Sequence, residues 1–292
     1  MPNIIHLAIP GFILLMMLEI YLSNRMHRDN YETKDALCSL AMGIGSQIFG
    51  LITKGLYILI FYWLYEHRLF TIGWGWWAWI LVFFADDFSY YIFHFTSHKC
   101  RYFWASHVVH HSSRKYTLAT ALRQTWTGDL TGSKVFWFWM PLVGFHPLMI
   151  FTMMAISLIY QFWIHTELID RLPRWFEFFF NTPSHHRVHH SNEIQYLDKN
   201  HAGILIIWDR IFGTFKAEKE HPVYGIRKNF RSFNPFRIAF DEWADIGKDL
   251  LKPIPFKQKL GYLFGPPGWS HDGSSKTTFE LQHALDQDVP QD

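Results

Sequence analysis

Long apolar runs separated by short polar segments fill the first half of the chain. The run at 4–22 can cross most of a hydrocarbon core of ~30 Å, since a helix rises about 1.5 Å per residue. The run at 37–65 is longer than one perpendicular crossing needs, and a third run begins at Trp74. A fourth, at 135–164, is broken by Gly-Phe-His-Pro at 144–147, which predicts a hairpin that enters the membrane and returns. The pattern predicts an all-α integral membrane bundle.

Composition supports a membrane protein over a soluble protein with buried core helices. Charged residues make up 18% of the 292 residues and aromatic residues 19%, whereas soluble domains contain about 25% charged residues. Trp, Tyr and Phe flank the apolar runs, as in the aromatic belts of membrane proteins. The formal net charge of +2 argues against a nucleic-acid partner, and two cysteines are too few for a disulfide scaffold.

The distribution of Lys and Arg predicts the orientation of the chain. Three of the 27 lie in 23–36, six in 96–134 and sixteen beyond residue 165, whereas 66–73 contains only Arg68. Positive charge is enriched in cytoplasmic loops. We therefore expect three crossings and a returning hairpin, with the C-terminus in the cytoplasm and the 66–73 loop on the opposite side.

Histidines are concentrated in two short windows. Of the 18 in the chain, five fall in 94–111 and three in 186–190. His-x-x-x-His occurs once and His-x-x-His-His twice, and each spacing places its imidazoles on one face of a helix. Imidazole is the commonest metal ligand among side chains. Buried structural histidines are the alternative, but the repeated spacing favours a cap of helices that encloses two metal ions.

Ligand type alone leaves the identity of the metal open. A zinc protease would carry Glu directly after the first His of the motif, but residue 95 is Phe and residue 187 is Arg. An all-nitrogen site suits Fe, Zn, Cu or Ni.

These three motifs, near the predicted cytoplasmic ends of membrane helices, resemble the fatty acid hydroxylase/sterol desaturase superfamily. Two stretches are most similar to its alkylglycerol monooxygenase branch and the bacterial relatives of that branch: HHSSRKYTLATALRQTW at 110–126 and NTPSHHRVHHSNEIQYLDKNHAGILIIWDRIFGTF at 181–215. The resemblance predicts N-terminal transmembrane helices at 1–80, a catalytic domain at 81–230, and a polar C-terminal lobe and tail at 231–292.

The resemblance implies a membrane enzyme with two non-haem irons, which zinc can replace in preparations. The catalytic ligands carried over by motif are His94, His98, His107, His110, His111, His186, His189 and His190. His165 matches a further histidine that the family places near the metals. Phe95 and Lys99 depart from the Arg and Glu that often follow the first two histidines in the family.

Residues beside the ligands are candidates for orienting them. Asp87 precedes His94 by seven residues and is expected on the same helix face, where it can accept an imidazole N–H. Glu167 and Asp198 are candidates for the same role, and His185 is expected just outside the ligand set.

The resemblance implies that the chain uses O₂ to oxidise a C–H bond of a membrane lipid, and ether cleavage with a reduced pterin is the reaction of the nearest branch. A sterol, sphingolipid or fatty-acyl hydroxylase or desaturase is the alternative enzyme, and a metal-binding membrane transporter or sensor is the alternative outside enzymes. The chain contains neither a Gly-x-Gly-x-x-Gly nor a Cys-x-x-Cys-His motif. We therefore expect a cytosolic electron donor.

Overall fold

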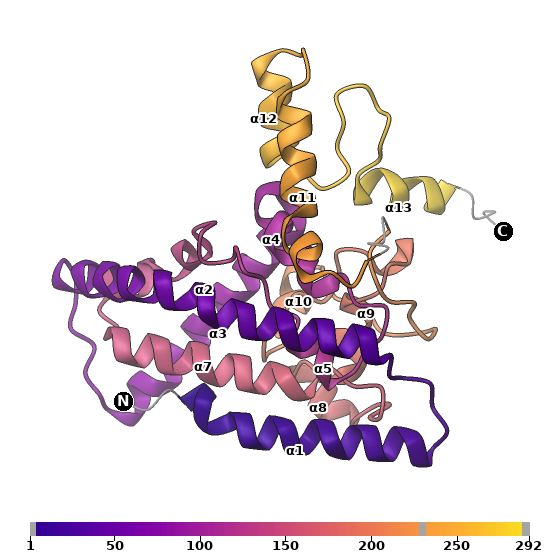
Figure 1. The fold of residues 1–292 in the computed structure, drawn as a ribbon. Helices are drawn as coiled ribbons and strands as arrows, with labels where there is room; N and C mark the ends of the chain where they lie inside the picture. The colour runs from indigo at the N-terminus through magenta and orange to yellow at the C-terminus, as the bar shows by residue number, and fades with distance from the viewer. Residues whose placement is uncertain (1–3, 228–231, 288–292) are drawn as a thin grey trace.

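The computed structural model describes residues 4–227 and 232–287 (Figure 1). Regular structure within these ranges is helical apart from one β-bridge between Ser191 and Tyr224, which confirms the predicted all-α class. The α-helices are α1 (Ile4–Arg25), α2 (Thr33–Glu66), α3 (Trp76–Lys99), α4 (Arg101–His111), α5 (Leu118–Ala121), α6 (Trp139–Val143), α7 (Pro147–Trp163), α8 (Arg174–Phe179), α9 (Pro183–His189), α10 (Ile207–Phe212), α11 (Pro235–Leu250), α12 (Phe256–Phe264) and α13 (Thr278–Gln287). Two 3₁₀ segments are η1 (Ser133–Trp137) and η2 (Ile194–Tyr196).

The first two helices have the length and surface of membrane-spanning segments. α1 has 22 residues and α2 has 34, and among the described helices these two are long and apolar enough to cross a bilayer. Large apolar side chains cover their outer faces, as at Leu51 and Ile52, which are 74% and 75% exposed. Water would not favour so much exposed apolar surface. Figure 1 shows α1, α2 and α7 running alongside one another.

The fourth apolar run reverses direction between an irregular first arm and α7, while its entry into the membrane stays a prediction. η1 and α6 make up this arm, and α7 returns from it. Pro141 lies within α6 and has no N–H for a helical hydrogen bond, which disfavours one continuous helix. The turn lies against the loop between α2 and α3, because Leu69 N donates to Leu142 O (2.7 Å) and Ile72 N donates to Gly144 O (3.2 Å).

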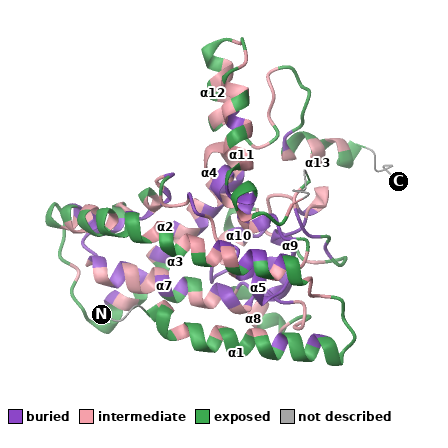
Figure 2. Cartoon of the chain, viewed as in Figure 1, coloured by how far each residue is buried: buried purple, intermediate pink, exposed green. Residues whose placement is uncertain are grey.

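Two of the apolar clusters join α2 to its neighbours. One joins α2, α3, α6 and α7 through Phe61, Val82, Met140 and Met149. The other joins α2 and α4 to α11, and it contains Cys38, Met42, Val109, Trp126 and Ile238. Figure 2 shows that burial is greatest around α9 and α5, whereas α1 is mostly exposed. The best-packed part of the chain is therefore the part where the histidine windows lie.

The C-terminal helices extend away from the bundle. α11 and α12 run side by side in Figure 1, across the direction of α1 and α2. Arg101, at the start of α4, fixes α11 through Glu242 (Nε–Oε1 2.7 Å) and Asp249 (NH1–Oδ2 2.6 Å), and it reaches α12 at Tyr262 O (3.5 Å). α13 returns to η2, where Gln282 Nε2 donates to the backbone oxygens of Ile194 and Leu197.

Gly45 allows Trp126 to pack directly on the backbone of α2. A Cβ at position 45 would lie 2.2 Å from Trp126 Nε1. The indole cannot easily move aside, because it is buried and its Nε1 donates to Met42 O (3.0 Å).

We expect Gly45→Ala to destabilise the fold by about 1–3 kcal/mol, the usual range for overpacking. The control is Gly50→Ala on the same helix, where a Cβ meets nothing within 4 Å. Apparent midpoints of thermal unfolding in detergent measure both changes. The midpoint should fall for Gly45→Ala and stay or rise for Gly50→Ala, so equal midpoints would contradict this packing.

Candidate metal centre

Nine histidines from four parts of the chain converge in two adjacent groups. The five-histidine group contains His94, His98, His107, His111 and His189. The four-histidine group contains His110, His165, His186 and His190. Within each group the candidate ligand atoms all lie within 4.8 Å of one another. These nine are the residues that the sequence predicted as metal ligands, and the fold brings all of them together.

The spacing of the histidines along each helix and the packing of the helices against one another position these side chains. The last turns of α3 carry His94 and His98, and α4 packs against α3. α9 supplies His186 and His189, with His190 at its C-cap, and His165 follows the end of α7. His110 and His111 are neighbours in sequence but point into different groups, so α4 contributes to both.

The Nε2 atoms approach one another as ligands of a common ion would. In the five-histidine group, His107 Nε2 lies 2.8 Å from His94 Nε2 and 3.1 Å from His111 Nε2. In the four-histidine group, His165 Nε2 lies 3.2 Å from His110 Nε2 and 3.0 Å from His186 Nε2. Two nitrogens bound to one ion at 2.0–2.1 Å are separated by about 2.9–3.4 Å for bond angles from square to tetrahedral.

Buried imidazole nitrogens without a hydrogen-bond partner provide a second test of whether these residues fit a metal ion. His98 Nε2 and His189 Nε2 are buried and have no hydrogen-bond partner among the described residues. Leaving such groups unsatisfied costs free energy, so each is expected to have a partner. A metal ion bound by Nε2 supplies that partner, and the residues present therefore fit one metal in each group.

Backbone carbonyls orient several of the imidazoles. The Nδ1 atoms of His94, His165 and His189 lie 2.7, 2.6 and 2.9 Å from the backbone oxygens of His201, Gln161 and Lys199. A carbonyl only accepts, so Nδ1 carries the proton and Nε2 is left with its lone pair. This is the tautomer that binds metal through Nε2.

Burial keeps the cluster in the form that binds metal. Burial lowers the pKa of His110 to about 4, and burial with neighbouring imidazoles lowers the pKa of His186 and His190 well below 6.5. The charged form is disfavoured without water to solvate it. The imidazoles are therefore neutral near pH 7.

Of the three residues predicted just outside the ligand set, Asp87 and Glu167 bind other partners than an imidazole of the two groups. Asp87 contacts no imidazole of the two groups; it accepts from Ile204 N (2.8 Å), Leu205 N (3.1 Å) and Trp208 Nε1 (2.9 Å). Asp87 therefore binds the segment that follows His201. His94, which was its predicted partner, instead donates from Nδ1 to the backbone oxygen of His201.

Glu167 binds another histidine, and His185, next to His186 on α9, stays a prediction. Glu167 Oε1 is 3.3 Å from Nε2 of His221, and the His185 ring packs on Phe215. Among the candidate carboxylates, Asp198 is the one beside a ligand candidate, with Oδ1 3.4 Å from His98 Nδ1. Lys99 Nζ, at the position that departs from the family pattern, is 2.7 Å from Asp198 Oδ2.

Sequence reasoning did not find His201. Its side chain is fully buried, neither ring nitrogen has a hydrogen-bond partner among the described residues, and its ring centroid is 5.1 Å from that of His98. It lies outside the repeated His-x-x-His-His spacing. The one feature of the sequence that pointed to it is its position within the 181–215 stretch that resembles the family.

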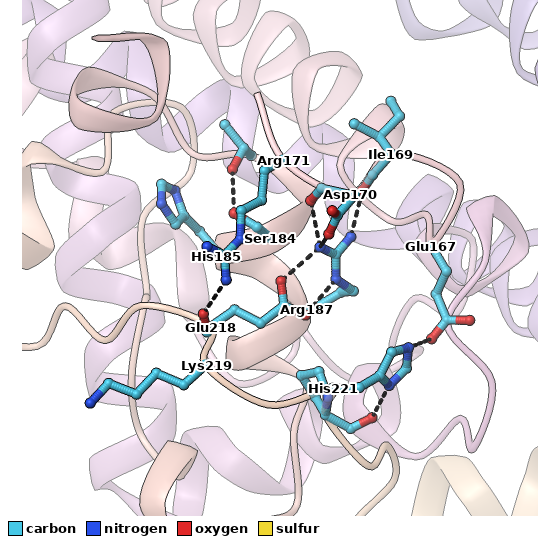
Figure 3. A network of polar contacts seen from close by, with 12 residues as sticks. Glu167, Ile169, Asp170, Arg171, Ser184, His185, Arg187, Glu218, Lys219 and His221 are labelled. Carbon is cyan, nitrogen blue, oxygen red and sulfur yellow. Dashed lines mark hydrogen bonds and ion pairs between the residues drawn. The ribbon is translucent and has the colours of Figure 1, made fainter. Parts of the chain in front are cut away.

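Arg187 ties the loop after α7 to α9, as Figure 3 shows. Its guanidinium binds the carboxylate of Glu218 (2.7 and 2.9 Å) and donates to the backbone oxygens of Ile169 (2.7 Å) and Asp170 (2.6 Å). His165 begins this loop and His186 lies on α9. The buried arginine therefore fixes two members of the four-histidine group relative to each other.

The all-helical, histidine-rich region is a recognisable domain. Residues 79–214 match the model of the fatty acid hydroxylase family, so the chain carries a domain of that family. It is 39% identical to the alkylglycerol monooxygenase of Homo sapiens over 92% of this chain and 60% of that protein. Identity to the alkylglycerol monooxygenase of Xenopus tropicalis is 35%, over 98% of this chain and 63% of that protein.

The similarity to these relatives extends well beyond the domain, but they are longer proteins. The alkylglycerol monooxygenase of Danio rerio is 36% identical over 92% of this chain and 60% of that protein. The chain thus spans about 60% of the length of the curated relatives it matches. No solved structure matches the chain. The two long apolar helices, in a chain that matches the fatty acid hydroxylase family, indicate a membrane protein.

The unequal groups generate a prediction about metal content. We expect His110→Ala, which leaves three imidazoles in its group, to lose most of one metal ion per chain. His111→Ala leaves four imidazoles in the other group, so its loss should be smaller. Iron and zinc are measured by elemental analysis of purified protein, with the exposed His67→Ala as the control. Unchanged metal content in His110→Ala would refute the grouping.

Proposed function

We propose that the chain is a di-iron oxygenase that uses O₂ to oxidise a C–H bond of a membrane lipid. The observation that carries this proposal is the pair of imidazole groups within a fatty acid hydroxylase domain. The names of the relatives support the same class of reaction. A transporter site would be expected near the bilayer midplane on broken helices. The histidines instead lie in the last turns of α3, on α4 and α9, and just beyond the end of α7, which favours the enzyme.

All nine histidines are proposed as metal ligands, with iron as the working metal. When bound, two irons supply the electrons that activate O₂, whereas zinc has no redox chemistry. The protein holds the imidazoles neutral, points their Nε2 atoms inward and excludes water. Water exclusion protects reactive oxidants from side reactions. The electron donor is proposed to be an external reductant, such as a reduced pterin, because the sequence has neither a Gly-x-Gly-x-x-Gly nor a Cys-x-x-Cys-His motif.

The position of the centre favours oxidation near the polar end of the lipid. His94 and His98 lie in the last turns of α3, and His165 lies just beyond α7. A lipid that enters from the bilayer with its headgroup at the interface brings its first chain carbons to such a site. In an alkylglycerol these include the carbon beside the ether oxygen. Hydroxylation there gives a hemiacetal, which breaks down to an aldehyde and glycerol.

We further propose that the histidine groups and the C-terminus face the cytoplasm. The 26–32 loop lies beside the histidine-rich region, since Arg28 NH1 donates to Glu167 O (2.9 Å). The 67–75 loop lies at the other end of the hairpin. A reporter fused at residue 292 should be active in the cytoplasm, and one inserted at residue 70 should be active outside. A C-terminus outside would overturn this orientation and remove access to a cytosolic reductant.

Product analysis tests the reaction itself. Membranes with the iron-loaded protein, an alkylglycerol, O₂ and a reduced pterin should yield a long-chain aldehyde and glycerol, and His190→Ala membranes should yield neither. Mass spectrometry measures both products. An unchanged ether lipid beside a hydroxylated sterol, sphingolipid or acyl chain would assign the chain to the alternative substrates. Oxidation confined to the terminal methyl end would contradict the positional argument.

A further inference from the structure

His201 is a buried imidazole that lies beside the five-histidine group without belonging to it. Its side chain is 0% exposed, and neither ring nitrogen has a hydrogen-bond partner among the described residues. Buried polar groups are almost always paired with protein, ordered water or an ion. The ring nitrogens of His201 therefore need a partner that the described part of the chain does not supply.

The ring of His201 is as close to members of this group as those members are to one another. Its centroid lies 5.1 Å from that of His98 and 5.8 Å from those of His94 and His189. Ring contacts within the group range from 4.3 Å between His94 and His189 to 6.3 Å between His107 and His189. His201 therefore lies against three of the five members, at the spacing of the group itself.

A buried carboxylate determines which nitrogen of His201 keeps its lone pair. Asp209 is fully buried and accepts from the backbone N–H groups of His201 and Ala202, both at 2.8 Å. Thr214 Oγ1 donates to the same carboxylate (2.5 Å), and Asp209 Oδ1 lies 3.6 Å from His201 Nδ1. A lone pair on Nδ1 would face this carboxylate, so the proton lies on Nδ1 and Nε2 keeps the lone pair. Histidines that bind metal commonly have a carboxylate beside the other ring nitrogen.

The turn that presents His201 is held in place despite a costly backbone conformation. Asp198 and Asn200 have φ angles of 55° and 56°, in the left-handed region that residues other than glycine seldom adopt. The Asn200 side chain fixes the turn, because its Nδ2 donates to the backbone oxygens of His185 (3.0 Å) and Lys216 (2.8 Å). Such conformations persist where the surroundings hold them, and they are commonest at functional sites. The position of His201 is thus specified by several independent contacts.

We propose that His201 is a tenth ligand of the metal centre and completes six imidazoles around the ion of the five-histidine group. This inference rests on the proposal that the nine histidines hold metal ions. An ion with six nitrogen ligands is coordinatively complete, whereas the ion of the four-histidine group keeps open positions. Catalytic metal sites keep an open position and structural ones do not. The four-histidine group is therefore the one that admits exchangeable ligands.

Cobalt(II), loaded in place of iron into the full-length protein in detergent, tests this assignment because its visible absorption bands report the number and type of ligands. EDTA should remove one of the two ions from His201→Ala about tenfold or more readily than from the unaltered protein, as is typical of changes around a metal. The cobalt bands should shift as well. Adding 4-methylimidazole, which replaces the missing side chain in its cavity, should restore both the bands and the resistance to EDTA.

Two further variants separate the loss of a ligand from the loss of packing. His201→Phe keeps an aromatic ring of similar size without nitrogens. It should lose cobalt as His201→Ala does, but 4-methylimidazole should restore nothing because no cavity is left. The matched control is Tyr91→Ala, since Tyr91 is buried and its ring centroid is 6.3 Å from that of His201. This change opens a cavity beside the same ring and removes no imidazole, so both readouts should stay unchanged.

The other outcomes each overturn the proposal. Unchanged cobalt bands and EDTA resistance in His201→Ala and His201→Phe would leave buried water as the partner of the two nitrogens. A loss that 4-methylimidazole does not restore in His201→Ala, or that Tyr91→Ala shares, would show that His201 acts by packing. Fewer than two cobalt ions in the unaltered protein would contradict the metal centre itself, and the role of His201 with it.

Discussion

The structure depends on keeping nine imidazoles, seven buried and two half-buried, neutral and pointed at two small volumes. A buried imidazole left free to rotate would turn its nitrogens toward any nearby donor, and a protonated cluster would repel itself and its metals. Backbone carbonyls at His201, Gln161 and Lys199 prevent this by accepting the Nδ1 protons. Ligand orientation is thus built into the course of the chain around the site.

This constraint explains why the irregular segments around the site are so well packed. The chain from Lys199 to Leu205 follows no helix, yet it provides two of the orienting carbonyls and the backbone amides that bind Asp87. Asp209 accepts from His201 N and Ala202 N, both at 2.8 Å, and holds the same segment from its other side. A change in the conformation of this segment would therefore disturb ligands that lie far away in sequence.

The sequence could predict the helices and the ligand candidates because both follow short-range rules. Apolar runs give helix positions, and His-x-x-His-His puts its histidines on one face whatever the rest of the fold does. The division of the histidines between groups follows no such rule: His110 and His111 separate because α4 passes between two partners, which only packing determines. Asp87 was misplaced for the same reason. Its face was predicted correctly, but the segment packed on that face comes from more than a hundred residues away.

Buried carboxylates connect the apolar helices to the histidine-rich region, one from each of the first three. On α1, Glu19 accepts from Leu118 N (2.8 Å), next to the region that holds His110. On α2, Asp35 binds Arg123 NH2 (2.7 Å), and Arg123 is the residue whose carbonyl faces His110. On α3, Asp87 binds the chain that follows His201.

A buried carboxylate on an apolar helix is costly unless it is paired or hydrogen-bonded. Each of these three takes at least two donors from the histidine-rich region, which it reaches only when that region is in its native position; Glu19 also accepts from Tyr31. Correct docking of the membrane helices and correct placement of the imidazoles therefore depend on the same contacts. For that reason the apolar helices act as part of the metal site's framework as well as its attachment to the bilayer.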